Sequence, residues 1–161
     1  MWALLVGTVA AVEPRFPEVV TRDLLDAERT LPADLPAERT LVVVAFFRQQ
    51  QSEVDTWLPA LRDAVRTHGV GLVEVPVVSG VWSTLEDQVT NAMKASIPEE
   101  ADRRATPPYF GDPEPFLDAL GLPGTDEIAV ALVARDGRVL WMARGPETPE
   151  SVRALRAALR Q

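Results

Sequence analysis

The chain of 161 residues contains no cysteine, one histidine and one lysine. The lack of cysteine excludes thiol catalysis, disulfide bonds and thiolate metal ligands. A transition-metal site is disfavoured too, because such sites usually need several His or Cys ligands and His68 is the only histidine. We therefore expect neither a metal nor any other cofactor.

The sequence also lacks a recognisable catalytic constellation. A Ser-His-Asp triad would have to use His68. That residue lies in THGVG, a segment typical of a helix C-terminus, where a histidine interacts favourably with the helix dipole. No pair of carboxylates has a spacing that indicates acid–base catalysis. The residues therefore indicate no reaction, and we expect that the protein is not an enzyme.

Positive charge is scarce, since the net charge is −8. An acidic surface repels phosphate backbones, so nucleic-acid binding is disfavoured. The 47% of hydrophobic and 25% of charged residues are ordinary for a globular protein. The length fits one domain with a real core, which we place at residues 14–161.

Residues 2–12, WALLVGTVAAV, form the longest uncharged apolar run near the amino terminus. The run is shorter than the about 20 residues that span a bilayer, so we predict no transmembrane helix. It is similar to the apolar part of a signal peptide but lacks the preceding positive charges. Two interpretations of this run stay open: an export or anchor segment at residues 1–13, or an extra buried strand. The location also stays open between exported or cell-envelope and cytoplasmic. Membrane association is expected only through this run.

Strands and helices alternate along the remaining chain. Short extended pieces at 18–20 and 29–31 predict a loose hairpin, and TLVVVAFF at 40–47 predicts a central strand buried on both faces. VGLVEVPVV at 70–78 predicts a second core strand, and the segments 128–134 and 138–144 flank Arg-Asp-Gly, which predicts a late hairpin. The pattern indicates a mixed sheet with helices on both faces.

Capping signals place the helix starts. Ser52 with Asp55, and Ser83 with Glu86, have the spacing of a capping box. Asp112 before Pro113, and Thr148 before Pro149, suit an N-cap followed by proline at the first helical position. The helical spacing after Ser52 predicts that Trp57 packs in the core.

The element order and three stretches of sequence resemble the thioredoxin-like superfamily, in its peroxiredoxin and membrane-tethered thiol-reductase branch. The stretches are FPEVVTRDLLDAERTLPADL, VVVAFFRQQQSEVDTWLPALRDA and ALVARDGRVLWMARGPETPE. The resemblance implies a thioredoxin-like α/β fold of three layers (α/β/α), with a central mixed sheet and an amino-terminal β-hairpin.

The resemblance also shows what this chain has lost. Aligning the second stretch puts the two cysteine positions of the family on Gln51 and Val54. The position of the usual cis-proline falls on Ile128, where a cis bond would cost about 3 kcal/mol, so we expect a trans peptide. Thiol oxidoreductase and peroxidase activities both need a thiolate and are excluded chemically.

A weaker similarity points to a mitochondrial assembly-factor family that acts on the membrane sector of ATP synthase. It rests on FFR, Trp57, PPYFGDPEPFLDALGLPG and VALVARDGRVLWMARG. The segment MKASIPEEADRRAT is similar to one in uncharacterised prokaryotic thioredoxin-like proteins. This similarity implies a chaperone-like or assembly role.

The turn after the central strand holds the candidate binding residues, because ligands of open α/β sheets bind at the carboxyl ends of the strands. A helix N-terminus there favours an anion, and an arginine suits carboxylate or phosphate. The candidates are Arg48, Gln50, Gln51, Ser52, Arg104 and Tyr109. Two plainer readings stand beside this one: a solvated turn in which Arg48 pairs with Asp55, and surface pairing of Arg104 with its acidic neighbours.

We therefore expect a redox-inactive thioredoxin-like domain that binds a protein or peptide partner, in the manner of an assembly or chaperone-like factor. The alternative is a small-anion-binding protein, or a non-redox enzyme, that uses an Arg/Gln pocket at the helix N-terminus.

Overall fold

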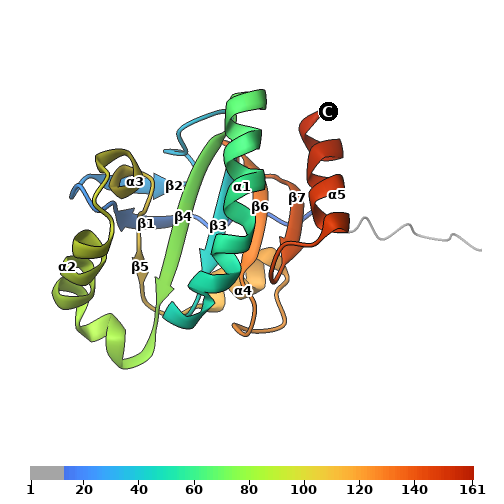
Figure 1. The fold of residues 1–161 in the computed structure, drawn as a ribbon. Helices are drawn as coiled ribbons and strands as arrows, with labels where there is room; N and C mark the ends of the chain where they lie inside the picture. The colour runs from blue at the N-terminus through green and yellow to red at the C-terminus, as the bar shows by residue number, and fades with distance from the viewer. Residues whose placement is uncertain (1–12) are drawn as a thin grey trace, which may run out of the picture.

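A computed structural model describes residues 13–161, in which a five-stranded mixed sheet forms the centre of the molecule (Figure 1). The strand order is β5-β4-β3-β6-β7. The strands are β3 (Arg39–Ala45), β4 (Gly71–Val78), β5 (Tyr109–Phe110), β6 (Ala129–Ala134) and β7 (Val139–Arg144). β4 runs parallel to β3 and β5, whereas β6 runs antiparallel to β3 and β7. This is the predicted mixed sheet.

The two central strands, β3 and β6, are buried on both faces, as continuous apolar runs require. Val43 stands opposite Glu74 of β4 on one side and Val130 of β6 on the other. Because every second residue points to the same face, the sheet separates two apolar clusters.

Each cluster is covered by different elements. On one face, α1 (Gln51–His68) and α5 (Pro149–Leu159) bury Trp57, Leu61 and Leu155 against the sheet (Figure 1). On the other face, Phe116 of α4 (Glu114–Leu120) packs with Phe16 and the amino-terminal hairpin. The three-layer α/β/α arrangement is therefore present as predicted.

The amino-terminal hairpin consists of β1 (Val19–Arg22) and β2 (Glu28–Leu31), paired antiparallel with Val19 opposite Leu31. Its turn is organised by the buried Asp23. This carboxylate accepts backbone N–H groups of Leu25 and Ala27 and forms an ion pair of 2.8 Å with Arg29. The predicted hairpin is confirmed, and it is tighter than the loose form expected from sequence.

The first part of the connection from β4 to β5 lies outside the core. The connection contains the 3-10 turn η2 (Gly80–Thr84), α2 (Glu86–Ser96) and α3 (Glu100–Arg104). Neither η2 nor α2 contains a buried residue. The predicted helix start at Ser83 is wrong, because Ser83 lies inside η2 and its hydroxyl donates to the Gly80 carbonyl. The α2 helix begins at Glu86 without a side-chain cap.

The other predicted caps have mixed outcomes. Thr148 is the N-cap of α5, as predicted, and it forms a capping box with Ser151. Ser52 is not an N-cap, because α1 already begins at Gln51 and the Ser52 hydroxyl donates to the Gln49 carbonyl. Asp112 accepts the Glu114 N–H at 3.0 Å, although Pro113 occupies the N-cap position itself.

Residues 1–12, with the predicted signal-like run, lie outside the described residues. Within residues 13–161, no helix combines the length and apolar character needed to cross a membrane.

Candidate functional site

The candidate site lies at the carboxyl edge of the sheet, where the parallel strands β3 and β4 end side by side. Ala45 at the end of β3 stands opposite Pro76 of β4, and β4 continues to Val78, so the turns that follow the two strands start at the same edge of the sheet. After β3 come Phe46, Phe47 and the 3-10 turn η1 (Arg48–Gln50), which runs into α1. After β4 comes η2.

Gln50 organises the turn after β3. Its side-chain oxygen accepts hydrogen bonds from the N–H groups of Phe46 at 2.8 Å and Phe47 at 3.2 Å. Its side-chain nitrogen donates to the Thr125 carbonyl at 2.7 Å. Only 5% of Gln50 is exposed. The amide is thus engaged within the fold at both ends, which fixes the turn against the loop before β6.

The three neighbouring candidates point to solvent. Arg48, Gln51 and Ser52 are all exposed. Gln51 donates to the Asp55 carboxylate at 3.1 Å. The alternative pairing of Arg48 with Asp55 is absent, since Arg48 takes part in no ion pair among residues 13–161. The turn therefore presents one unpaired cation at the start of α1.

The remaining two candidates lie elsewhere. Arg104 pairs with Glu100 within α3, as the plainer reading expected. The next residue, Ala105, accepts a hydrogen bond from the Glu74 N–H halfway along β4, so Arg104 is not brought to Arg48. Tyr109 packs edge-on against Phe116, with ring centres 5.2 Å apart, on the sheet face opposite α1. The structure therefore assembles no pocket from Arg48 and Arg104.

The two positions that we align with the cysteines of the thioredoxin-like family have different environments. Gln51 is exposed at the first turn of α1, whereas Val54 is fully buried in the cluster that also contains Ile128. Leu31–Pro32 is the one cis peptide bond within residues 13–161, so the bond before Ile128 is trans, as predicted. One of these positions thus faces solvent and the other lies in the core.

Trp57 is in the core, as predicted, and it is also hydrogen-bonded. Its indole nitrogen donates to the Gly145 carbonyl at 2.9 Å, which connects α1 to the end of β7. Trp141 meets it edge-on at 5.8 Å between ring centres. Trp141 and Met142 are partly buried against opposite apolar clusters, because successive residues of a strand point to opposite faces of the sheet.

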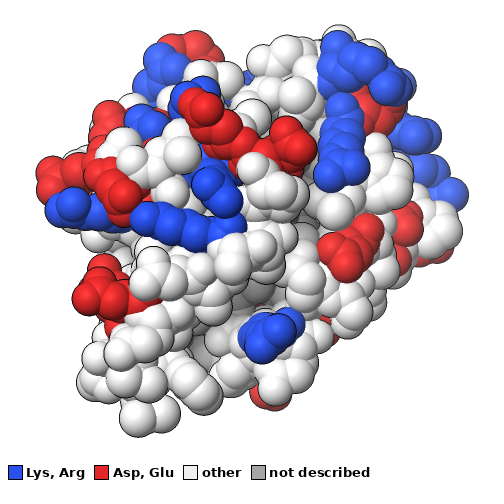
Figure 2. Space-filling model, turned by 60° about the vertical axis from the view of Figure 1, so that its left-hand side comes forward, with Lys and Arg blue, Asp and Glu red and all other residues white. Residues whose placement is uncertain are grey.

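Three large apolar side chains are exposed at the carboxyl edge, and sequence reasoning missed them as a group. Phe47 is 49% exposed, Val81 is 68% exposed and Trp82 is 61% exposed. We call these three residues the edge patch. On the face drawn in Figure 2 the charged side chains gather mainly in the upper half, while the lower half is mostly uncharged and hollowed. The strand ends lie in that lower half (Figure 1).

Glu74 of β4 is the titratable group with the most altered environment near α1. Burial raises its pKa, and the carboxylates of Asp55 and Asp102 raise it further. Asp55 comes from α1 and Asp102 from α3, so carboxylates of two other elements act on Glu74. Within residues 13–161, no group of three or more acidic, His or Cys side chains is arranged to hold a metal ion.

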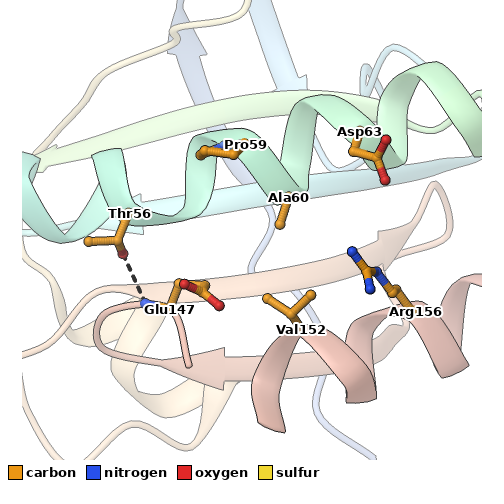
Figure 3. Close-up of a pocket in the computed structure, with 7 residues that line it drawn as sticks. All are labelled: Thr56, Pro59, Ala60, Asp63, Glu147, Val152 and Arg156. Atoms are coloured by element: carbon orange, nitrogen blue, oxygen red, sulfur yellow. Dashed lines mark hydrogen bonds between the residues drawn. The ribbon is translucent and has the colours of Figure 1, made fainter. Parts of the chain in front are cut away.

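A second hollow, of about 310 Å³, lies between α1 and α5 (Figure 3). The hydroxyl of Thr56 accepts the Glu147 N–H at 2.9 Å at one end, and Asp63 and Arg156 face the groove from the two helices toward the other end. It is an open groove between packed helices, away from the N-terminus of α1. Its lining residues are Thr56, Pro59, Ala60, Asp63, Glu147, Val152 and Arg156.

Comparison with solved structures shows a thioredoxin-like fold. A putative electron transport protein from Aquifex aeolicus matches with a TM-score of 0.64 and 14% identity, covering 93% of this chain and 97% of that one. A putative thiol:disulfide interchange protein DsbE from Chlorobium tepidum matches with a TM-score of 0.53 and 20% identity, covering 91% and 96%. BsSco, a member of the Sco family of cytochrome c oxidase assembly proteins, matches with a TM-score of 0.57 and 14% identity. The match covers 92% of this chain and 95% of that one.

Neither a protein-family model nor a curated protein matches the sequence. The chain therefore has the fold of the thioredoxin-like proteins and no cysteine with which to perform their thiol chemistry. What remains at the site is an exposed arginine, a helix N-terminus and an apolar surface.

Proposed function

We propose that this domain binds another protein through the edge patch and uses the thioredoxin-like fold as a scaffold for recognition rather than for redox chemistry. The observation that carries the proposal is that most of the exposed large apolar side chains lie at one edge of the sheet. Five large apolar side chains of residues 13–161 are exposed, and three of them, Phe47, Val81 and Trp82, lie in turns at the same edge of the sheet.

Single exposed apolar residues are normal on a protein surface. Large apolar residues that gather at one edge of a sheet favour a site that another molecule covers. Tryptophan is also among the residues that contribute most to protein interfaces. Arg48, next to Phe47, adds an unpaired donor-rich cation that orients a partner carrying a carboxylate or carbonyl.

Assembly of a larger complex is a narrower form of the same proposal. It agrees with the weak sequence similarity to an ATP-synthase assembly-factor family, and with the naming of BsSco for cytochrome c oxidase assembly. At 14% identity, that neighbour supports a common fold only. The alternative small-anion site has weaker support, because Arg104 lies apart from Arg48 and is paired with Glu100.

Photo-crosslinking from two matched valines tests the proposal. A photoreactive amino acid replaces Val81 in the patch or Val20 on β1, which is exposed to a similar extent, 62% against 68%. In the source cells we expect a discrete crosslinked product from position 81 only, and its loss when Trp82→Ser is added. Equal crosslinking from both positions, or a product that survives Trp82→Ser, would overturn the proposal.

A further inference from the structure

The surface around the edge patch carries both signs of charge, divided between its two turns. Arg48 follows Phe47 on the β3 side, whereas Glu86 and Asp87 follow Trp82 on the β4 side, in the first turn of α2. All three charged side chains are exposed. None of them forms an ion pair within residues 13–161. The β3 side therefore combines Phe47 with an unpaired positive charge, and the β4 side combines Trp82 with unpaired negative charges.

A partner that covers both turns has to meet three requirements. It buries Phe47, Val81 and Trp82, it places an anion against Arg48, and it places a cation against Glu86 and Asp87. The same patch on a second copy of the chain, related to the first by a two-fold axis, meets all three requirements. The β3-side turn of one copy, apolar and positive, then faces the β4-side turn of the other, apolar and negative.

We infer that a second copy of this chain occupies the patch, in an isologous dimer that brings Phe47 and Arg48 of each copy against Trp82, Glu86 and Asp87 of the other. The inference rests on the proposed function and specifies its partner. Self-complementary patches of this kind are the commonest route to closed oligomers. The η2 turn and α2 bury no residue in the single chain, so the dimer gives this outlying segment a surface to pack against.

Two features set the strength of the dimer. The apolar patch is small, which is typical of weak and reversible interfaces. The net charge of −8 on each copy adds a repulsion that salt screens, because the Debye length falls to about 8 Å at physiological ionic strength. We therefore expect a monomer–dimer equilibrium that depends on protein concentration.

Analytical ultracentrifugation of the full chain over a concentration series is the first test. The wild type is expected to dimerise reversibly. Trp82→Ser weakens the dimer about tenfold or more, because tryptophan anchors contribute strongly to interfaces. Val20→Ser, at a matched exposed valine, leaves the equilibrium unchanged. A wild type that stays monomeric at the highest soluble concentration, or a dimer unaffected by Trp82→Ser, overturns the inference.

A charge exchange tests the two-fold arrangement itself. Arg48→Glu alone, and Glu86→Arg with Asp87→Arg alone, each place like charges across the interface and reduce self-association. An equimolar mixture of these two variants pairs opposite charges at both contacts, so the mixed dimer forms. Failure of the mixture to associate, while the wild type dimerises, overturns the arrangement.

The two proposals fail separately. A monomeric wild type that still gives a crosslinked product from position 81, of a mass that excludes a second copy, overturns this inference and keeps the proposed function. A monomeric wild type with no specific product from position 81 overturns both.

Discussion

The side-chain nitrogen of Gln50 donates a hydrogen bond of 2.7 Å to the carbonyl oxygen of Thr125. The two residues are 75 positions apart in the chain, and the bond joins the turn before α1 to the loop before β6. The same side chain also accepts the N–H groups of Phe46 and Phe47. One buried amide therefore holds together the turn before α1 and the loop before β6.

Removal of this amide should destabilise the fold. Gln50→Ala leaves two backbone donors and one backbone acceptor without their partner, and a buried unsatisfied group costs about 1–3 kcal/mol. We expect a loss of about 3 kcal/mol in the free energy of unfolding, measured by urea denaturation. Gln50→Glu retains the acceptor and loses the donor, so an intermediate loss is expected. Gln49→Ala, at an exposed neighbour, should change stability by less than about 0.5 kcal/mol, and an equal effect of the two alanine variants contradicts the assignment.

Glu74 should make the fold less stable as the pH rises. Burial, then Asp55, then Asp102 raise the pKa of this carboxyl in the folded state. The folded protein thus holds the proton more tightly than the unfolded chain, so stability falls as pH rises from the ordinary pKa of about 4.3 through the raised value. The penalty is fully present above that raised value and absent below the ordinary one.

Glu74→Gln should therefore stabilise the protein at neutral pH and leave its stability nearly unchanged well below the ordinary carboxyl pKa. Urea denaturation at a series of pH values measures the difference between the two proteins. Glu28→Gln, at an exposed strand position, controls for the loss of one negative charge. A constant difference between Glu74→Gln and wild type across the whole range would rule out the linkage.

Position 51 should still favour an anion. The chain has no cysteine, so Gln51→Cys and Thr67→Cys each carry a single thiol, at opposite ends of α1. The helix dipole stabilises a thiolate at the N-terminus and disfavours one at the C-terminus, and Arg48 adds to the effect at position 51. We expect Gln51→Cys to be alkylated by iodoacetamide several-fold faster than Thr67→Cys at about pH 7.

The pH profile of alkylation gives the sharper comparison. The thiol of Gln51→Cys should have a pKa below the ordinary value of about 8.5, and that of Thr67→Cys should not. Adding Arg48→Ala should raise the thiol pKa of the Gln51→Cys variant and leave that of the Thr67→Cys variant unchanged. Coinciding profiles for the two positions would show that the N-terminus of α1 no longer favours an anion.

The fold was predictable because its central strands have strong local signals. TLVVVAFF and IAVALVA are continuous apolar runs, and they became β3 and β6, buried on both faces. Arg-Asp-Gly marked the last hairpin, and Gly69 ended α1 with a positive φ of 65°, as expected. In these segments the local preference and the tertiary environment favour the same structure.

The binding surface was harder to predict because exposure depends on packing between distant segments. Trp57 and Trp82 both lie in segments with apolar neighbours, yet Trp57 is fully buried and Trp82 is 61% exposed. The difference arises because η2 and α2 stand away from the core, which no local pattern indicates. Ser52 was mistaken for an N-cap because the turn η1 leads directly into α1, so the helix begins one residue earlier.

The first described residues are held by the last hairpin. Val139 donates to the Pro14 carbonyl at 3.1 Å, and the Phe16 N–H donates to the Gly137 carbonyl at 2.8 Å. During synthesis, the segment around Phe16 therefore has to wait until more than a hundred further residues have left the ribosome before it reaches its place. Pairing across such sequence separations slows folding. An amino-terminal fragment that ends before β6 should accordingly be unable to fold, and it would depend on other factors for protection from aggregation during translation.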